Sequence, residues 1–138
     1  MLLVDTNIIL EVLLSRAKKE ECKEFLKTLA DAKKSGIVTD FTIHSIIVIM
    51  GSLNKLNELK TFLLSLQAYK GLHIHHITIA DEVSAIEIAI QQHLDMDDAI
   101  QYSSALSTNA EAIISFDKHF DGLKIPRKEP QLNGNPKA

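Results

Sequence analysis

The chain has 138 residues, of which 46% are hydrophobic and 24% are charged, a composition typical of one soluble globular domain. The formal net charge of −3 at pH 7 gives no sign of the strongly basic surface with which many proteins bind nucleic acid. The single cysteine, Cys22, excludes an intrachain disulfide framework and a cysteine-rich zinc module. The longest apolar run, residues 46–50, is far shorter than the roughly 18 residues of a membrane helix. Asp5 interrupts the apolar N-terminus, which argues against a signal peptide, and we expect a cytoplasmic protein.

Short apolar runs alternate along the chain with longer segments of helical periodicity. Apolar residues recurring at i, i+3, i+4 and i+7 predict amphipathic helices, and residues 42–50, apolar nearly all round, predict a buried helix. Strands are expected at residues 2–4, 37–38, 72–77 and 112–115. Helices are expected at residues 8–14, 18–32, 42–50 and 56–66, and after the candidate N-caps Thr78 and Asp95.

Two features of these helices bear on packing. Asp81 lies three residues after Thr78, which predicts a shortened capping box. The helix that follows is expected to pack through an apolar stripe formed by Val83, Ile86 and Ile90. The leucine stripe of residues 56–66 is assigned to the core, with a dimer interface as the open alternative.

The order of these elements predicts the fold class. Short strands separated by helices need crossover connections, which give a parallel sheet covered by helices on both faces. We expect one α/β domain over residues 1–123. Residues 124–138 contain all three prolines and are expected to form a partly ordered or loose C-terminal tail.

Four acidic residues are placed by this topology at one edge of the sheet. Asp5, Asp40 and Asp117 follow strands, and Asp98 stands in the first turn of a helix, so all four approach the edge where ligands bind in such sheets. Clustered carboxylates repel unless a cation neutralises them. Oxygen ligands suit Mg²⁺ or Mn²⁺, which can activate water against a phosphodiester. The alternative is that each Asp only caps a helix.

Three motifs, taken in order, resemble those of the PIN-domain nucleases, a family that includes the VapC-type toxins. They are LLVDTN at residues 2–7, LDMDDAI at residues 94–100 followed by Ala105, and IISFDKHF at residues 113–120. The resemblance implies a three-layer α/β/α fold with a short central parallel sheet of four to five strands. It also implies a metal-dependent RNA endonuclease that forms a homodimer and acts as the toxin of a toxin–antitoxin pair, with an antitoxin protein as partner.

The resemblance assigns roles to residues of these motifs. Asp5, Asp98 and Asp117 would be catalytic and would hold Mg²⁺ or Mn²⁺ or its waters. Asn7 and Ser115 would orient these carboxylates, and Thr6 would fix the turn from strand to helix.

One position departs from the family pattern. The family has a Glu in the helix after the second strand, and that position falls at Ser45, beside His44; no Glu occurs between Glu24 and Glu58. Compensation is expected from one of four nearby residues, or from a water. These residues are Asp40, His44, Asp95 and Asp97.

Two other functions remain as alternatives. A degraded site would leave a PIN-like domain that binds RNA or a protein partner without cleaving. A phosphatase of another doubly wound family would need a second Asp where Asn7 stands, which ranks it last. Two histidine features are given structural interpretations: His119 is expected on the surface, and the pair His73 and His75 lacks an evident third metal ligand.

Overall fold

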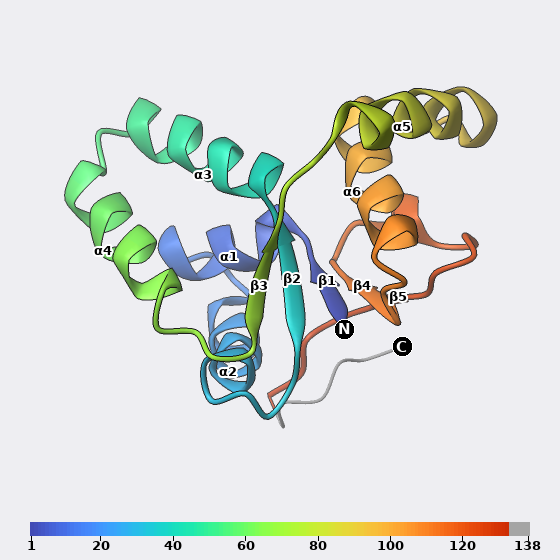
Figure 1. Ribbon diagram of the computed structural model, residues 1–138. Coiled ribbons are helices and arrows are strands. Elements are labelled where there is room, and N and C mark those ends of the chain that lie inside the picture. The colour runs from blue at the N-terminus through green and yellow to red at the C-terminus, as the bar shows by residue number, and fades with distance from the viewer. Residues whose placement is uncertain (133–138) are drawn as a thin grey trace.

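A five-stranded parallel sheet forms the middle layer of the protein (Figure 1). The structure is a computed structural model and describes residues 1–132. The strands are β1 (Leu2–Val4), β2 (Gly36–Thr39), β3 (Leu72–His75), β4 (Ala112–Ile114) and β5 (Arg127–Lys128). They lie in the order β3-β2-β1-β4-β5, and every pair is parallel. The predicted parallel α/β sheet is therefore confirmed.

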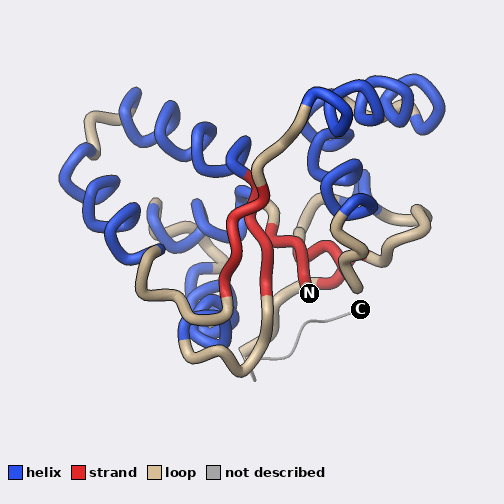
Figure 2. Tube along the Cα trace, in the orientation of Figure 1, coloured by secondary structure: helices blue, strands red, loops and turns tan. Residues whose placement is uncertain are grey.

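Within residues 1–132, six α-helices and one short 3₁₀ helix connect the strands and cover the sheet (Figure 2). They are α1 (Thr6–Leu13), α2 (Lys19–Ala30), α3 (Asp40–Ser52), α4 (Leu56–Leu66), α5 (Ile79–Gln92), α6 (Met96–Ser107) and η1 (Lys118–Phe120). The helices α1 to α4 gather on one side of the sheet, and α5 and α6 on the other (Figure 1). The result is the three-layer arrangement that the resemblance implied.

The alternation of side chains along the strands divides the core in two. Val4 and Ile114 are fully buried among residues of α1 to α4. Leu3 and Ile113, their neighbours in sequence, are fully buried on the opposite face, with Tyr102 of α6. Because successive residues of a strand point to opposite faces, three-residue strands are enough to anchor both helical layers.

Polar residues at the ends of the strands begin the helices that follow. The Thr39 hydroxyl accepts from the Thr42 amide at 3.0 Å and caps α3. Thr78 and Asp81 form the predicted capping box of α5. Asp95 occupies the N-cap position of α6, as predicted, but its side chain makes no capping hydrogen bond. The caps at Thr39 and Thr78 fix the N-termini of α3 and α5 near the carboxyl edge of the sheet.

The helix α3 is not buried all round, contrary to the sequence prediction. Ile46 and Met50 are fully buried, whereas Val48 is 70% exposed and His44 is exposed. The helix packs on α1 and α4 along one stripe only. The prediction that α3 is buried on all sides was therefore wrong. Apolar composition does not tell how many neighbouring elements surround a helix.

The apolar stripe through which α5 was predicted to pack also faces outward. Val83, Ile86 and Ile90 are 51%, 49% and 70% exposed, while Ala85 is fully buried. The helix packs against α6, which lies between it and the sheet (Figure 1). Ala85 and Ile88 face the core on this side, so the stripe of Val83, Ile86 and Ile90 is left on the surface. In α4, Leu59 is buried but Leu56 is 59% exposed, so the leucine stripe is only partly core.

The segment after residue 123 continues the sheet before it leaves the described part of the chain. Ile125 is buried, and β5 pairs with β4. The rest of the predicted tail, residues 133–138, lies outside the described residues. The division into a domain of residues 1–123 and a tail stays a prediction. Within residues 1–132, no helix is both long and apolar enough to cross a membrane.

Candidate functional site

A polar pocket of about 350 Å³ lies at the carboxyl edge of the sheet. It is bounded by the residues that follow β1 and β4 and by the N-terminal parts of α3 and α6. Its acidic lining residues are Asp5, Asp95, Asp97, Asp98 and Asp117, and no Lys or Arg is among its described lining residues. The three carboxylates expected to converge thus line one pocket, as the sheet-edge rule predicts.

Asp5 is held rigidly at the end of β1. Its side chain is 7% exposed. Oδ1 accepts from the Thr6 amide at 2.8 Å, so Asp5 does cap α1, and Oδ2 accepts from the Ser115 hydroxyl at 2.7 Å. Burial raises the pKa of Asp5, these hydrogen bonds oppose the rise, and the charge of Asp117 adds to it. The capping and site interpretations of Asp5 are therefore compatible.

Ser115 connects two of the acidic residues. Its hydroxyl donates to Asp5 and accepts from the Asp117 backbone amide at 2.9 Å. The Asp117 side chain in turn accepts from the His119 amide at 2.9 Å and begins η1. One hydroxyl thus sets the relative position of the first and last acids, in the orienting position expected for Ser115.

Asp98 and Asp117 form the most strongly interacting part of the site. The Nδ1 atom of His119 lies 3.3 Å from Asp98 Oδ2 and 3.0 Å from Asp117 Oδ1. Burial, and after it the charges of Asp117 and Asp5, raise the pKa of Asp98 to about 6, while the contact with His119 opposes the rise. The charge of Asp117, followed by the hydrogen bond and charge of Asp98, raises the pKa of His119. Desolvation and like charges therefore favour a protonated Asp98, whereas opposite charges favour a protonated His119.

Gln101 is a site residue that sequence reasoning missed. It is 2% exposed, and its Nε2 donates to Thr42 Oγ1 at 2.7 Å and lies 3.5 Å from Asp5 Oδ1. Its Oε1 accepts from the Thr39 hydroxyl at 3.1 Å. The signal available was position: Gln101 follows Asp98 by three residues and so shares its helix face.

The turn after β1 is tied into this network. Thr6 Oγ1 lies 2.9 Å from Thr42 Oγ1, so the starts of α1 and α3 are joined. Asn7 lines the pocket, and its Oδ1 accepts from Arg16 at 3.2 Å at the exposed rim. Thr6 therefore links this turn to α3, whereas Asn7 is bonded to Arg16 and not to a carboxylate.

The structure also shows which residues surround Ser45, the position at which the family pattern has a Glu. Ser45 lines the pocket, together with Asp95 and Asp97, while His44 is exposed and is not among the lining residues. Asp40 is not among them either: its carboxylate accepts from the Ile77 amide at 3.2 Å and holds the connection from β3 to α5. A helix turns 100° per residue, so His44 and Ser45, adjacent in sequence, face different directions.

The donor set fits a divalent cation. One ligand atom each from Asp98, Asp117 and His119 lies within 4.8 Å of the other two, and within residues 1–132 no other group of three His, Cys, Asp or Glu residues does so. Carboxylate oxygens suit Mg²⁺ and Mn²⁺, and an imidazole nitrogen suits the transition metal. The repulsion that raises the pKa of Asp98 is the repulsion that a bound cation would relieve.

Solved structures of bacterial toxins share this fold. A toxin–antitoxin complex from Klebsiella pneumoniae has a TM-score of 0.69 and 18% identity, covering 90% of this chain and 93% of that one. Mycobacterium tuberculosis VapC20, a toxin that cleaves the Sarcin–Ricin loop, has a TM-score of 0.68 and 12% identity, covering 85% and 90%. Rickettsia felis VapBC2, bound to a DNA fragment from their promoter, has a TM-score of 0.69 and 14% identity, covering 94% and 98%.

Sequence comparisons give the family. No curated protein matches the sequence. The family model of the PIN domain matches residues 2–125, nearly the whole described chain. The match spans all three motifs and every residue of the acidic pocket. The chain belongs to the PIN domain family.

Proposed function

We propose that this protein is a divalent-metal-dependent RNA endonuclease and the toxin of a toxin–antitoxin pair. The observation that carries the proposal is the pocket in which Asp5, Asp98 and Asp117 come together in a PIN domain. Because no Lys or Arg lines the described pocket, a phosphate group needs a cation there to be attracted at all. Structural similarity to a toxin that cleaves the Sarcin–Ricin loop supports RNA as the substrate.

The residues divide into those that hold the cation and those that orient them. Asp5, Asp98 and Asp117 would hold Mg²⁺ or Mn²⁺ or its waters. When bound, such an ion polarises the phosphodiester and lowers the pKa of water. Ser115 and Gln101 hold Asp5 in place, and Ser115 also fixes the backbone of Asp117. Orientation by such partners typically changes metal affinity or activity by about 10- to 100-fold.

The test is cleavage of a structured RNA by the purified protein. We expect cleavage with Mn²⁺ or Mg²⁺, none with a chelator, and none by Asp98→Asn. The Glu82→Gln variant, which removes a negative charge from the exposed first turn of α5 outside the pocket, should retain cleavage. Cleavage that survives the chelator and Asp98→Asn would refute the proposal.

Ser45 favours one second candidate, a non-catalytic PIN domain. A serine hydroxyl carries no charge, so the pocket has one carboxylate fewer than the family pattern provides. If this loss is decisive, the protein will bind RNA in the presence of Mn²⁺ without cutting it. A gel-shift measurement beside the cleavage assay separates the two functions.

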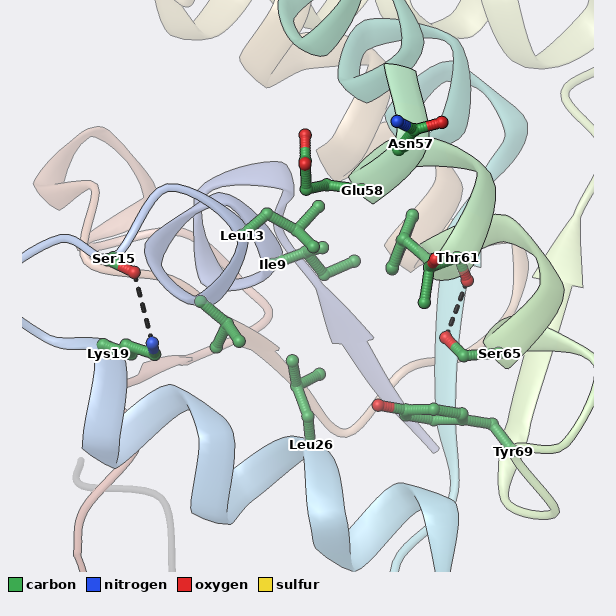
Figure 3. A pocket seen from close by; sticks show the side chains of 12 residues that line it. Ile9, Leu13, Ser15, Lys19, Leu26, Asn57, Glu58, Thr61, Ser65 and Tyr69 are labelled. Atoms are coloured by element: carbon green, nitrogen blue, oxygen red, sulfur yellow. Dashed lines mark hydrogen bonds between the residues drawn. The ribbon is translucent and has the colours of Figure 1, made fainter. Parts of the chain in front are cut away.

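An apolar groove provides a surface for a protein partner (Figure 3). It has a volume of about 550 Å³ and lies between α1, α2 and α4, with Ile9, Leu13 and Leu26 among its lining residues. A concave apolar surface suits an inserted segment of another chain. Because two of the similar structures contain toxin–antitoxin assemblies, we assign this groove to an antitoxin. Co-expression with the product of the neighbouring gene, with and without Leu13→Asp, tests the assignment by co-purification.

The exposed stripe of α5 is assigned to a homodimer. Ile79 joins Val83, Ile86 and Ile90 on one convex face, at 76% exposure. A convex apolar stripe is self-complementary when two copies meet about a twofold axis. Sedimentation should show a dimer for the native chain and a monomer for Ile86→Asp. Dimers that persist in Ile86→Asp would place the interface elsewhere.

A further inference from the structure

His119 occupies the position of a ligand in the acidic pocket. Its Nδ1 atom lies 3.0 Å from Asp117 Oδ1 and 3.3 Å from Asp98 Oδ2. The side chain is 69% exposed and lines the pocket. It is therefore neither a buried structural histidine nor a residue facing away from the site.

The backbone around His119 fixes this position. Its amide donates to Asp117 Oδ1 at 2.9 Å, which sets the start of η1. The next residue, Phe120, is fully buried against the core on the α6 side of the sheet. Because Phe120 is anchored in the core and the His119 amide is bonded to Asp117, the ring stays close to the two carboxylates.

The spacing of the three ligand atoms suits coordination of one ion. Neighbouring ligands of an octahedral ion with bonds of about 2.1 Å lie about 3 Å apart. The distances of 3.0 and 3.3 Å from Nδ1 to the two carboxylate oxygens are close to this value. All three atoms lie within 4.8 Å of one another, so the ring can exchange its contacts with the carboxylates for contacts with a shared ion by a small movement.

We propose that His119 supplies a nitrogen ligand in place of the carboxylate that Ser45 lacks, and that it makes the site selective for Mn²⁺ over Mg²⁺. The inference rests on the proposed metal-dependent function. Mg²⁺ strongly prefers oxygen ligands, whereas imidazole suits transition metals. His44, the nitrogen donor nearest to Ser45 in sequence, is exposed and is not a lining residue of the pocket. Among the described residues that line the pocket, His119 is the one histidine.

Electron spin-echo spectroscopy of bound Mn²⁺ tests the ligand directly, because a coordinated imidazole gives ¹⁴N modulation and carboxylates do not. The experiment uses the untagged full chain with one equivalent of Mn²⁺. We expect ¹⁴N modulation in the native protein and in His73→Gln, a control that removes an exposed histidine of β3, and none in His119→Gln. Calorimetry should show that His119→Gln weakens Mn²⁺ about tenfold or more and Mg²⁺ by less.

The outcomes separate this inference from the proposed function. Mn²⁺ binding without ¹⁴N modulation in the native protein would overturn the role of His119 and leave the metal site intact. Modulation that persists in His119→Gln, or equal weakening of Mn²⁺ and Mg²⁺, would also overturn it. Absence of any Mn²⁺ binding would overturn the metal-dependent function itself. Matching melting curves of the two glutamine variants establish that both are folded.

Discussion

Replacement of Asp98 by Asn should stabilise the metal-free protein. The pKa of this carboxyl rises from 3.8 to about 6 on folding, so at pH 8 the fold carries a charge that it disfavours. At full weight the shift corresponds to about 3 kcal/mol; because solvent screens part of it, we expect about 1–2 kcal/mol. Loss of a negative charge from the first turn of α6 opposes this gain by about 0.3–1 kcal/mol.

Asp97→Asn is the matched control, because it removes the same charge from the same helical turn at an exposed position. It shares the helix-terminus cost but does not relieve the repulsion between Asp98 and Asp117. Because the helix-terminus cost cancels, urea unfolding at pH 8 with a chelator should find Asp98→Asn more stable than Asp97→Asn by about 1–2 kcal/mol. For a chain of this size the difference corresponds to about 3–7 °C in melting temperature.

The pH dependence of the free energy of unfolding shows whether the raised pKa of Asp98 causes the difference in stability. Between pH 3.8 and about 6 the unfolded state loses the Asp98 proton before the folded state does, so the free energy of unfolding of the native chain falls as the pH rises. The advantage of Asp98→Asn should be full above pH 6 and nearly absent at pH 4. An advantage independent of pH, or a variant less stable than Asp97→Asn, would refute the reasoning.

Bound metal should make the native chain more stable than Asp98→Asn, the reverse of their order without metal. Saturation of the site at 100 times the dissociation constant adds about 2.7 kcal/mol to the native chain, and Asp98→Asn should gain much less because it lacks a charged ligand. If Mn²⁺ stabilised both proteins equally, Asp98 would not be part of the metal site.

Three further predictions concern the rest of the pocket. Gln101→Leu should lower the free energy of unfolding by about 1–3 kcal/mol, since it leaves the buried Thr42 hydroxyl without its 2.7 Å donor; the exposed Gln91→Leu should change it little in the same urea titration, and equal losses would contradict the network. Ser45→Glu should raise Mg²⁺ affinity and cleavage together and destabilise the metal-free fold; equal, strong Mg²⁺-dependent cleavage by both proteins would show that another residue already supplies the acid. Asp5→Asn should abolish cleavage yet keep or raise the melting temperature without metal, because burial already disfavours the Asp5 carboxylate; a large fall would mean that Asp5 serves mainly as a cap.

The local features of this protein were determined by its sequence. The apolar runs before Asp5 and Ser115 fixed the strands β1 and β4, and Thr78 with Asp81 fixed the start of α5. Because parallel strands joined by helices place their carboxyl ends at one edge, the acidic pocket also followed from the sequence. These features depend on residues close in the chain and on a topological rule that holds whatever the packing.

Tertiary structure decided which side chains enter the pocket and which helix faces stay exposed. His119 is 69% exposed, as expected, but it also lines the pocket, whereas His44, expected near the site, is not among the lining residues. The stripe of Val83, Ile86 and Ile90 was expected to pack α5 against the core and is exposed, because α5 packs on α6 and turns Ala85 and Ile88 inward instead. Periodicity identifies the apolar face of a helix, but what covers that face depends on the arrangement of all the other elements, and the local sequence does not encode it.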